Sequence, residues 1–135
     1  MALISTKLHG ILDYTVGMLL VVSTYVLELG TGGPQTWLPL ILGFSTLTYS
    51  LLTNYEAGPV KLLPMKAHLL LDTISGVLLI TGPWIFHFTD KIFWPHILTG
   101  CLEIIIVVLS STHPYRRSRK HIPLDRQHKV HPDLY

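Results

Sequence analysis

The chain has 135 residues, of which 49% are hydrophobic and only 13% are charged, and its mean hydropathy is +0.46. Because soluble domains carry about 25% charged residues, this composition indicates a membrane protein and excludes an intrinsically disordered chain. The single cysteine excludes a small disulfide scaffold. The net charge of +2 conceals a separation, since residues 1–112 contain four Lys and six acids whereas residues 113–135 contain six Lys or Arg and two Asp.

Four apolar segments approach the length of about 20 residues that a helix needs to cross a bilayer. In chain order they run over about 8–29, 37–52, 67–88 and 92–109, and short stretches rich in Gly, Pro, Asn or Asp separate them. The segments are too long and too uniformly apolar for strands, and they lack the charged face of a soluble amphipathic helix. The second is the shortest, but Trp37, Tyr49 and Tyr55 near its ends fit an interfacial aromatic belt. The sequence therefore predicts an all-α integral membrane four-helix bundle.

The basic residues predict how this bundle is oriented. Nine of the ten Lys and Arg precede the first segment, lie between the second and third, or follow the fourth, and Lys91 alone lies between the third and fourth. Positively charged loops stay in the cytoplasm, so we expect a multi-pass protein of the bacterial inner membrane with both termini cytoplasmic. The first segment lacks a small-x-small cleavage site, so we expect it to be retained rather than removed as a signal peptide.

The sequence contains an internal repeat, which is informative about architecture. Residues 9–29, HGILDYTVGMLLVVSTYVLEL, align with residues 68–88, HLLLDTISGVLLITGPWIFHF. With a shift of two residues, Trp37 and Gly43 also align with Trp94 and Gly100. The repeat predicts two tandem transmembrane hairpins within residues 1–112, one over about 8–55 and one over about 67–112, related by a pseudo-two-fold axis along the membrane normal. Residues 113–135 would form a separate cytoplasmic tail.

A short motif ends the first helix of the second hairpin. Gly82-Pro83-Trp84 follows the run SGVLLI at 75–80, and Ser23-Thr24-Tyr25 holds the equivalent place in the first hairpin without the proline. Over roughly residues 8–110 the chain resembles the SPW-repeat family of small bacterial integral membrane proteins, whose repeat is a helix pair with a Ser-Pro-Trp signature at this place. The resemblance implies a membrane protein of unassigned biochemical role and supplies no catalytic residues.

Ionisable side chains inside the predicted spans are the main candidates for a site, because such residues are costly in a bilayer and face the bundle interior. His9 and Asp13 are four residues apart and share one helical face, and His68 and Asp72 repeat this spacing. Each histidine is expected to bond the aspartate of its own helix.

Two further features accompany these pairs. Gly17 and Gly76 follow one turn further in, and we interpret the His-Asp-Gly stripe as the contact line between the first and third helices, since glycine lets helix backbones approach closely. Glu103 lies about 9 Å from the end of the fourth helix at 1.5 Å per residue, so all three acids are expected to share one layer.

Three interpretations of this polar layer remain open. In the first, the pairs set bundle packing, Glu103 bonds a Ser, Thr or Tyr such as Tyr49, and the protein is a non-enzymatic scaffold or accessory subunit. In the second, the layer handles protons or cations. In the third, His9 and His68 ligate a metal or haem within the bundle. No diagnostic ligand or catalytic motif is present, so the sequence predicts no enzyme and no specific cofactor, and leaves the metal unknown.

The tail begins with a basic cluster directly after the fourth helix, formed by Arg116, Arg117, Arg119 and Lys120. Such a cluster is typical of contact with anionic lipid headgroups. Nucleic acid is not an expected partner, because the tail contains no folded nucleic-acid-binding module. We expect the lipid bilayer as the main partner, with assembly into a homo-oligomer or a larger membrane complex as a further expectation.

Overall fold

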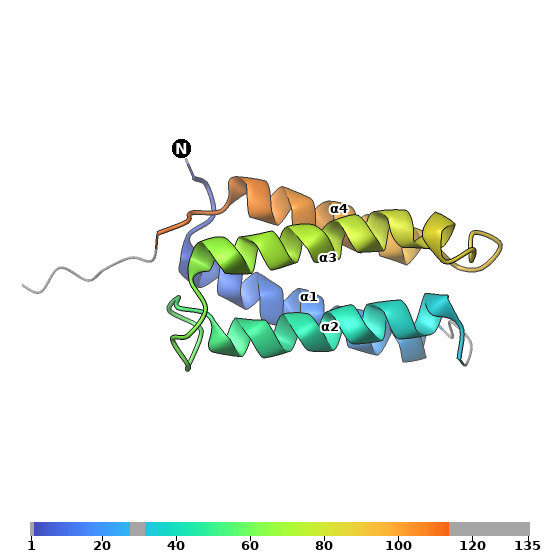
Figure 1. Cartoon of the computed structure of the whole chain (residues 1–135), viewed down its shortest axis with the longest axis horizontal. Helices are drawn as coiled ribbons and strands as arrows, with labels where there is room; N and C mark the ends of the chain where they lie inside the picture. Colours follow the sequence, from blue (N-terminus) through green and yellow to red (C-terminus); the bar gives the residue numbers. More distant parts are fainter. Residues whose placement is uncertain (1, 28–31, 114–135) are drawn as a thin grey trace, which may run out of the picture.

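The computed structural model describes residues 2–27 and 32–113, which form four α-helices and no named strand (Figure 1). These are α1 (Thr6–Val26), α2 (Pro34–Leu52), α3 (Met65–Ile85) and α4 (Trp94–Leu109). The all-α bundle expected from the sequence is thereby confirmed. The helices α1 and α3 begin and end earlier than the apolar segments. Ser5 caps α1 by accepting a hydrogen bond from the Leu8 N–H.

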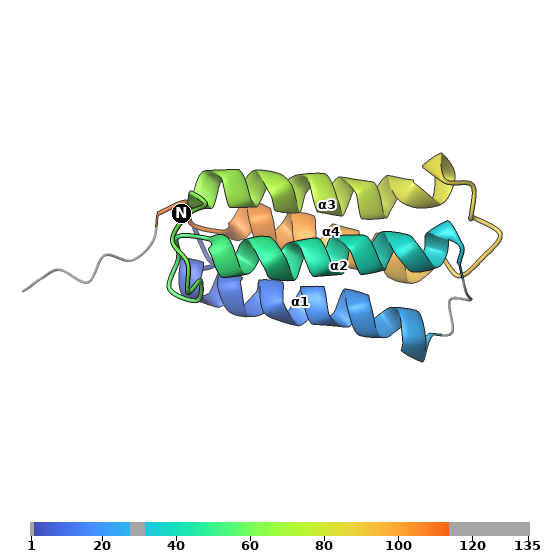
Figure 2. The same cartoon turned by 60° about the horizontal axis from the view of Figure 1, so that its bottom comes forward.

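The helices form two antiparallel hairpins that lie against each other. The closest pairs are α1 with α2 and α3 with α4, with fewer contacts between α2 and α3 and between α1 and α4. In Figure 2, α2 and α4 lie between α1 and α3. The first helices of the two repeats are therefore diagonal in the bundle.

This arrangement corrects the expected role of the glycines. A Cβ on Gly17 would lie 3.2 Å from the Gly43 carbonyl oxygen, and one on Gly76 would lie 3.1 Å from the Gly100 carbonyl oxygen. The two glycines thus let α1 approach α2 and α3 approach α4, and they do not form an α1–α3 contact line. A step of four residues advances about 40° around a helix, so Gly17 lies about 80° away from the face that His9 presents.

The ends of the helices are tied together by matching backbone contacts in the two repeats. Ser111 N–H donates to the Ile4 carbonyl over 2.9 Å, and Asn54 N–H donates to the Leu63 carbonyl over 2.8 Å. Parallel bridges pair Ile4 with Ser110 and Leu63 with Thr53. The segment that leads into each first helix is therefore fixed against the end of the other repeat's second helix, which sets where His9 and His68 enter the bundle.

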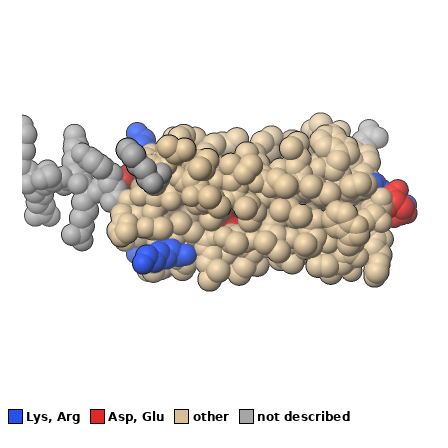
Figure 3. All heavy atoms as spheres, turned by 90° about the horizontal axis from the view of Figure 1, so that it is seen from above, with Lys and Arg blue, Asp and Glu red and all other residues tan. Residues whose placement is uncertain are grey.

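The distribution of polarity is that of a bundle surrounded by lipid. Helices α1 and α3 are long and apolar enough to cross a membrane, and α4 is a shorter apolar helix. Large apolar side chains such as Met18, Phe44 and Val108 are exposed, whereas six His, Asp or Glu side chains of the helices are buried. Figure 3 shows charged side chains at the two ends of one face, with an almost uncharged surface between them.

Candidate functional site

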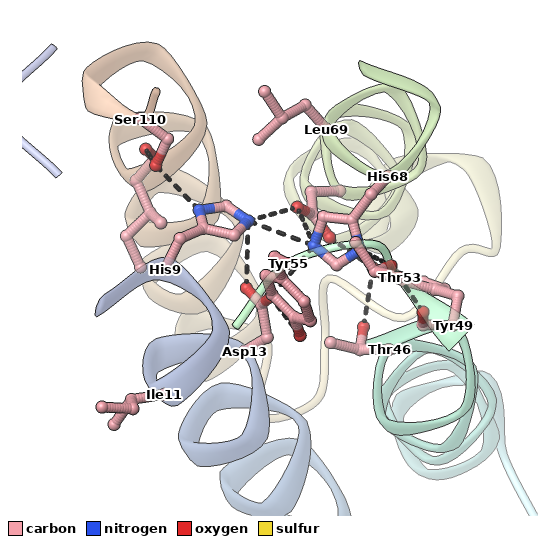
Figure 4. A network of polar contacts seen from close by, with 12 residues as sticks. His9, Ile11, Asp13, Thr46, Tyr49, Thr53, Tyr55, His68, Leu69 and Ser110 are labelled. Atoms are coloured by element: carbon pink, nitrogen blue, oxygen red, sulfur yellow. Dashed lines mark hydrogen bonds and ion pairs between the residues drawn. The ribbon is translucent and has the colours of Figure 1, made fainter. Parts of the chain in front are cut away.

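Five of the six buried His, Asp and Glu side chains converge at the end of the bundle where α1 and α3 begin, and the sixth, His96, lies apart from them beside the Gln35 carbonyl. Two histidines and two aspartates, here called the His–Asp cluster, offer ligand atoms that all lie within 4.8 Å of one another. They come from equivalent positions of the two repeats, and Figure 4 shows the His9 and His68 rings pointing toward each other. Both histidine side chains are 0% exposed. The cluster consists of His9, Asp13, His68 and Asp72.

Each histidine contacts both aspartates, and its shorter contact is with the aspartate of the other repeat. His68 Nε2 lies 2.9 Å from Asp13 and 3.2 Å from Asp72. His9 Nε2 lies 3.1 Å from Asp72 and 3.3 Å from Asp13. The expected bonding of each histidine to its own aspartate is therefore incomplete, because the diagonal helices bring the two pairs into one four-membered group.

The other nitrogen of each ring is held by a hydroxyl group at the end of a second helix. His9 Nδ1 lies 2.7 Å from Ser110 Oγ, and His68 Nδ1 lies 2.8 Å from Thr53 Oγ1. Both hydroxyls donate their own proton to the backbone carbonyl four residues earlier, over 2.6 Å for Ser110 and 2.7 Å for Thr53. Each hydroxyl oxygen is thus left as an acceptor, so Nδ1 carries the ring proton and donates it.

When the two rings are neutral, this arrangement directs their Nε2 lone pairs toward the centre of the cluster. The two Nε2 atoms, one from His9 and one from His68, lie 3.1 Å apart. Two unprotonated nitrogens at this distance repel each other unless a positive charge lies between or upon them. The geometry can therefore hold a proton or a metal cation, whereas a haem ligated between the two rings would require them to separate.

Two tyrosines donate hydrogen bonds to the carboxylates. Tyr49 on α2 donates to Asp72 Oδ1 over 2.6 Å, and Tyr55 in the connection before α3 donates to Asp13 Oδ2 over 3.3 Å. Burial raises the pKa of the Tyr55 hydroxyl, and the nearby Asp13 raises it further against the opposing effect of Ser50. Tyr55 therefore remains protonated and continues to donate to Asp13.

Glu103 lies in the same layer but outside the cluster. It lines a cavity of about 10 Å³ together with His9, Asp13 and Asp72. Among the described residues, neither of its carboxylate oxygens has a hydrogen-bonding partner. The expected bond from Tyr49 to Glu103 is wrong, because the Tyr49 hydroxyl donates to Asp72 instead.

The remaining predicted residues lie elsewhere. Gly82 and Pro83 are buried near the far end of α3, and Trp84 is exposed there. The basic tail residues Arg116, Arg117, Arg119 and Lys120 are outside the described residues. Sequence reasoning missed Thr53, Ser110 and Tyr55. The first two occupy equivalent positions when Trp37 is aligned with Trp94, so extending the repeat to the helix ends would have identified them.

A family model described as the SPW repeat domain matches residues 7–110. No curated protein and no solved structure matches the chain. The match spans both hairpins and includes all residues of the His–Asp cluster. The chain is a membrane protein that belongs to the SPW repeat family.

Proposed function

We propose that this protein binds one divalent transition-metal cation at the His–Asp cluster, without catalysing a reaction. The observation that carries the proposal is the pair of Nε2 atoms of His9 and His68, which face each other at 3.1 Å while both Nδ1 atoms are bonded to hydroxyls. Metal-ligating histidines in proteins are commonly held in this way through their second ring nitrogen.

The spacing of the ligand atoms supports a single small ion. Four ligands at bond lengths of 2.0–2.1 Å around a tetrahedral zinc ion are roughly 3.3 Å apart. In the cluster the Nε2–Nε2 distance is 3.1 Å and the four His–Asp distances run from 2.9 to 3.3 Å. These distances are close to the tetrahedral spacing, and all four ligand atoms lie within 4.8 Å of one another, so one small cation can be bound after adjustment of the carboxylates.

The charges also favour a divalent ion. The carboxylates of Asp13 and Asp72 carry two negative charges, and neutral imidazoles add none, so a divalent cation makes the group neutral. Neutrality matters because an uncompensated charge is costly inside a bilayer. Two imidazoles with two carboxylates suit borderline first-row metals such as Zn²⁺, Co²⁺ and Fe²⁺.

The competing account is that the cluster only sets bundle packing, as in a scaffold or accessory subunit. Protonation of both histidines would also neutralise the two aspartates, and the resulting ion pairs would join the repeats. This account predicts no metal affinity, so the two accounts differ in a measurable quantity.

The test is titration of the purified, chelator-treated protein in detergent with Zn²⁺, followed by equilibrium dialysis and metal analysis. We expect one Zn²⁺ per chain in the wild type and loss of binding in Asp13→Asn with Asp72→Asn. His96→Gln is the matched control, because His96 is buried but bonds the Gln35 carbonyl outside the cluster. A folded wild-type protein that takes up no stoichiometric Zn²⁺ would overturn the proposal in favour of the packing account.

We further propose that the protein crosses the bacterial inner membrane several times with both termini in the cytoplasm. Lys7, Lys61 and Lys66 support this orientation, since all three lie at the end of the bundle where α1 and α3 begin. The His–Asp cluster would then be near the cytoplasmic face, with the basic tail close to anionic headgroups. The cation would exchange with the cytoplasm.

A further inference from the structure

We infer that the cation at the His–Asp cluster keeps one exchangeable coordination position, and that Glu103 is the positioning residue that holds a water molecule there. The inference rests on the proposed function and goes beyond it, because it distinguishes an open site from a closed structural one. Closed metal sites use protein groups for every ligand, whereas open sites retain a position for water or a small anion.

The first support is the state of the Glu103 side chain. It is 6% exposed, and neither carboxylate oxygen has a hydrogen-bonding partner among the described residues. A buried carboxyl group without a partner is costly, so such a group calls for a specific explanation. The packing of α3 against α4 brings the Ser75 hydroxyl near Glu103, but among the described residues neither group meets the geometry of a hydrogen bond.

The second support is the cavity between Glu103 and the cluster. Its volume is about 10 Å³, and His9, Asp13, Asp72 and Glu103 line it. This is about the space of one water molecule, and polar groups on several sides are what such a water needs. A water bound to the cation in this cavity would lie within reach of the Glu103 carboxyl group.

The third support is a break in the symmetry of the two repeats. When Trp37 is aligned with Trp94, the residue equivalent to Glu103 in the first repeat is Thr46. When His9 is aligned with His68, the residue equivalent to Ser75 is Val16. Thr46 lines the same cavity, but its hydroxyl is already bonded to Tyr49 over 3.1 Å. The bundle therefore accommodates a smaller residue at the equivalent position, and the carboxyl group of Glu103 is an addition on one side of the cluster only.

The apolar layer beyond the cavity limits what can enter it. Val16 and Ile106 line the cavity, and they pack with Leu20 and Leu79 in one buried cluster. Leu79 is 0% exposed. The open position therefore has room for a water or a small anion of similar size and no room for an organic substrate.

Co²⁺ provides the probe for this position, because its visible absorption is more intense in four-coordinate than in five-coordinate sites. We expect the Co²⁺-loaded wild type to show the weaker five-coordinate spectrum and to shift on addition of fluoride, an anion of about the size of the water that it replaces. An intense four-coordinate spectrum that fluoride does not shift would overturn the inference while leaving metal binding intact. Failure to bind Co²⁺ or Zn²⁺ at all would instead overturn the proposed function.

Variants of Glu103 identify the residue that holds the water. In Glu103→Leu the apolar side chain occupies the cavity, so we expect retained Co²⁺ binding, a more intense spectrum and loss of the fluoride shift. Glu103→Gln keeps a hydrogen-bonding group and is expected to restore the shift. Thr99→Val is the control expected to behave as wild type, because the Thr99 hydroxyl on α4 bonds the Pro95 carbonyl outside this cavity. Glu103→Thr, which installs the residue of the other repeat, replaces Glu103→Leu if that variant does not fold. An unchanged fluoride shift in the Leu or Thr variant would contradict the assignment to Glu103.

Discussion

The Nε2 atoms of His9 and His68 lie 3.1 Å apart, although the two residues come from different repeats and from helices that are diagonal in the bundle. Their Nδ1 atoms are fixed by hydroxyls of Ser110 and Thr53, each from the second helix of the opposite repeat. A cation-binding group of this kind requires both repeats, because neither hairpin alone contains a complete ligand set with its supporting hydroxyls.

The Thr53 hydroxyl is expected to contribute to metal affinity without touching the metal. In Thr53→Val the His68 ring loses the acceptor at Nδ1, so it is no longer held in one tautomer and orientation. Loss of such a supporting contact typically lowers metal affinity by about 10–100-fold. The dissociation constant for Zn²⁺, measured by competition with a chelator, checks this. Thr81→Val is the control, because the Thr81 hydroxyl bonds the Val77 carbonyl at an exposed position. Equal dissociation constants for Zn²⁺ in the two variants would exclude a role for Thr53.

Removal of one cluster charge is expected to destabilise the metal-free protein. Asp72→Asn leaves two histidines and Asp13 buried with an incomplete set of partners, and loss of one partner of a buried pair costs about 3–5 kcal/mol. The free energy of unfolding in detergent measures the effect. Asp90→Asn is the comparison, because Asp90 pairs with Lys91 over 3.5 Å at an exposed position and such pairs contribute little. Similar unfolding free energies for the two variants would indicate that the cluster does not stabilise the fold.

The close approach within each hairpin is expected to be sensitive to a single methyl group. A Cβ on Gly100 would lie 2.6 Å from the Gly76 carbonyl oxygen, so Gly100→Ala forces α3 and α4 apart. Overpacking of this kind costs about 1–3 kcal/mol, which thermal unfolding in detergent would detect. Leu98→Ala on the exposed side of α4 is the control, and a Gly100→Ala protein as stable as this control would contradict the close contact.

The expected topology has its own test. A reporter enzyme that works only in the cytoplasm should be active when it is fused after Tyr135. A reporter enzyme that works only in the periplasm should be active when it is inserted at Asp90. The reason is the concentration of Lys and Arg in the segments on one side of the four-helix arrangement. A periplasmic signal from the fusion at Tyr135 would reverse the orientation or reduce the number of spans.

The sequence was sufficient to predict the four helices and the common layer of acids, because hydropathy and the duplicated His-Asp spacing are local properties. It was not sufficient to predict that His68 lies closer to Asp13 than to Asp72. The spacing of four residues reveals neighbours on one helix only, and contacts between diagonal helices depend on how the hairpins pack. Tyr55 was not predicted as a hydrogen-bond donor to Asp13 for the same reason, because it lies in the segment between α2 and α3 and not on a helix.

X-ray absorption spectroscopy of the zinc-loaded protein would show whether imidazoles of both repeats bind one metal ion, as we propose. The predicted spectrum contains nitrogen or oxygen ligands at about 2.0–2.1 Å and the outer-shell scattering of two imidazole rings per zinc ion. His68→Gln should reduce the imidazole scattering to one ring. Zinc bound without imidazole scattering, or with sulfur from Cys101 as a ligand, would contradict the assignment of the site to the His–Asp cluster.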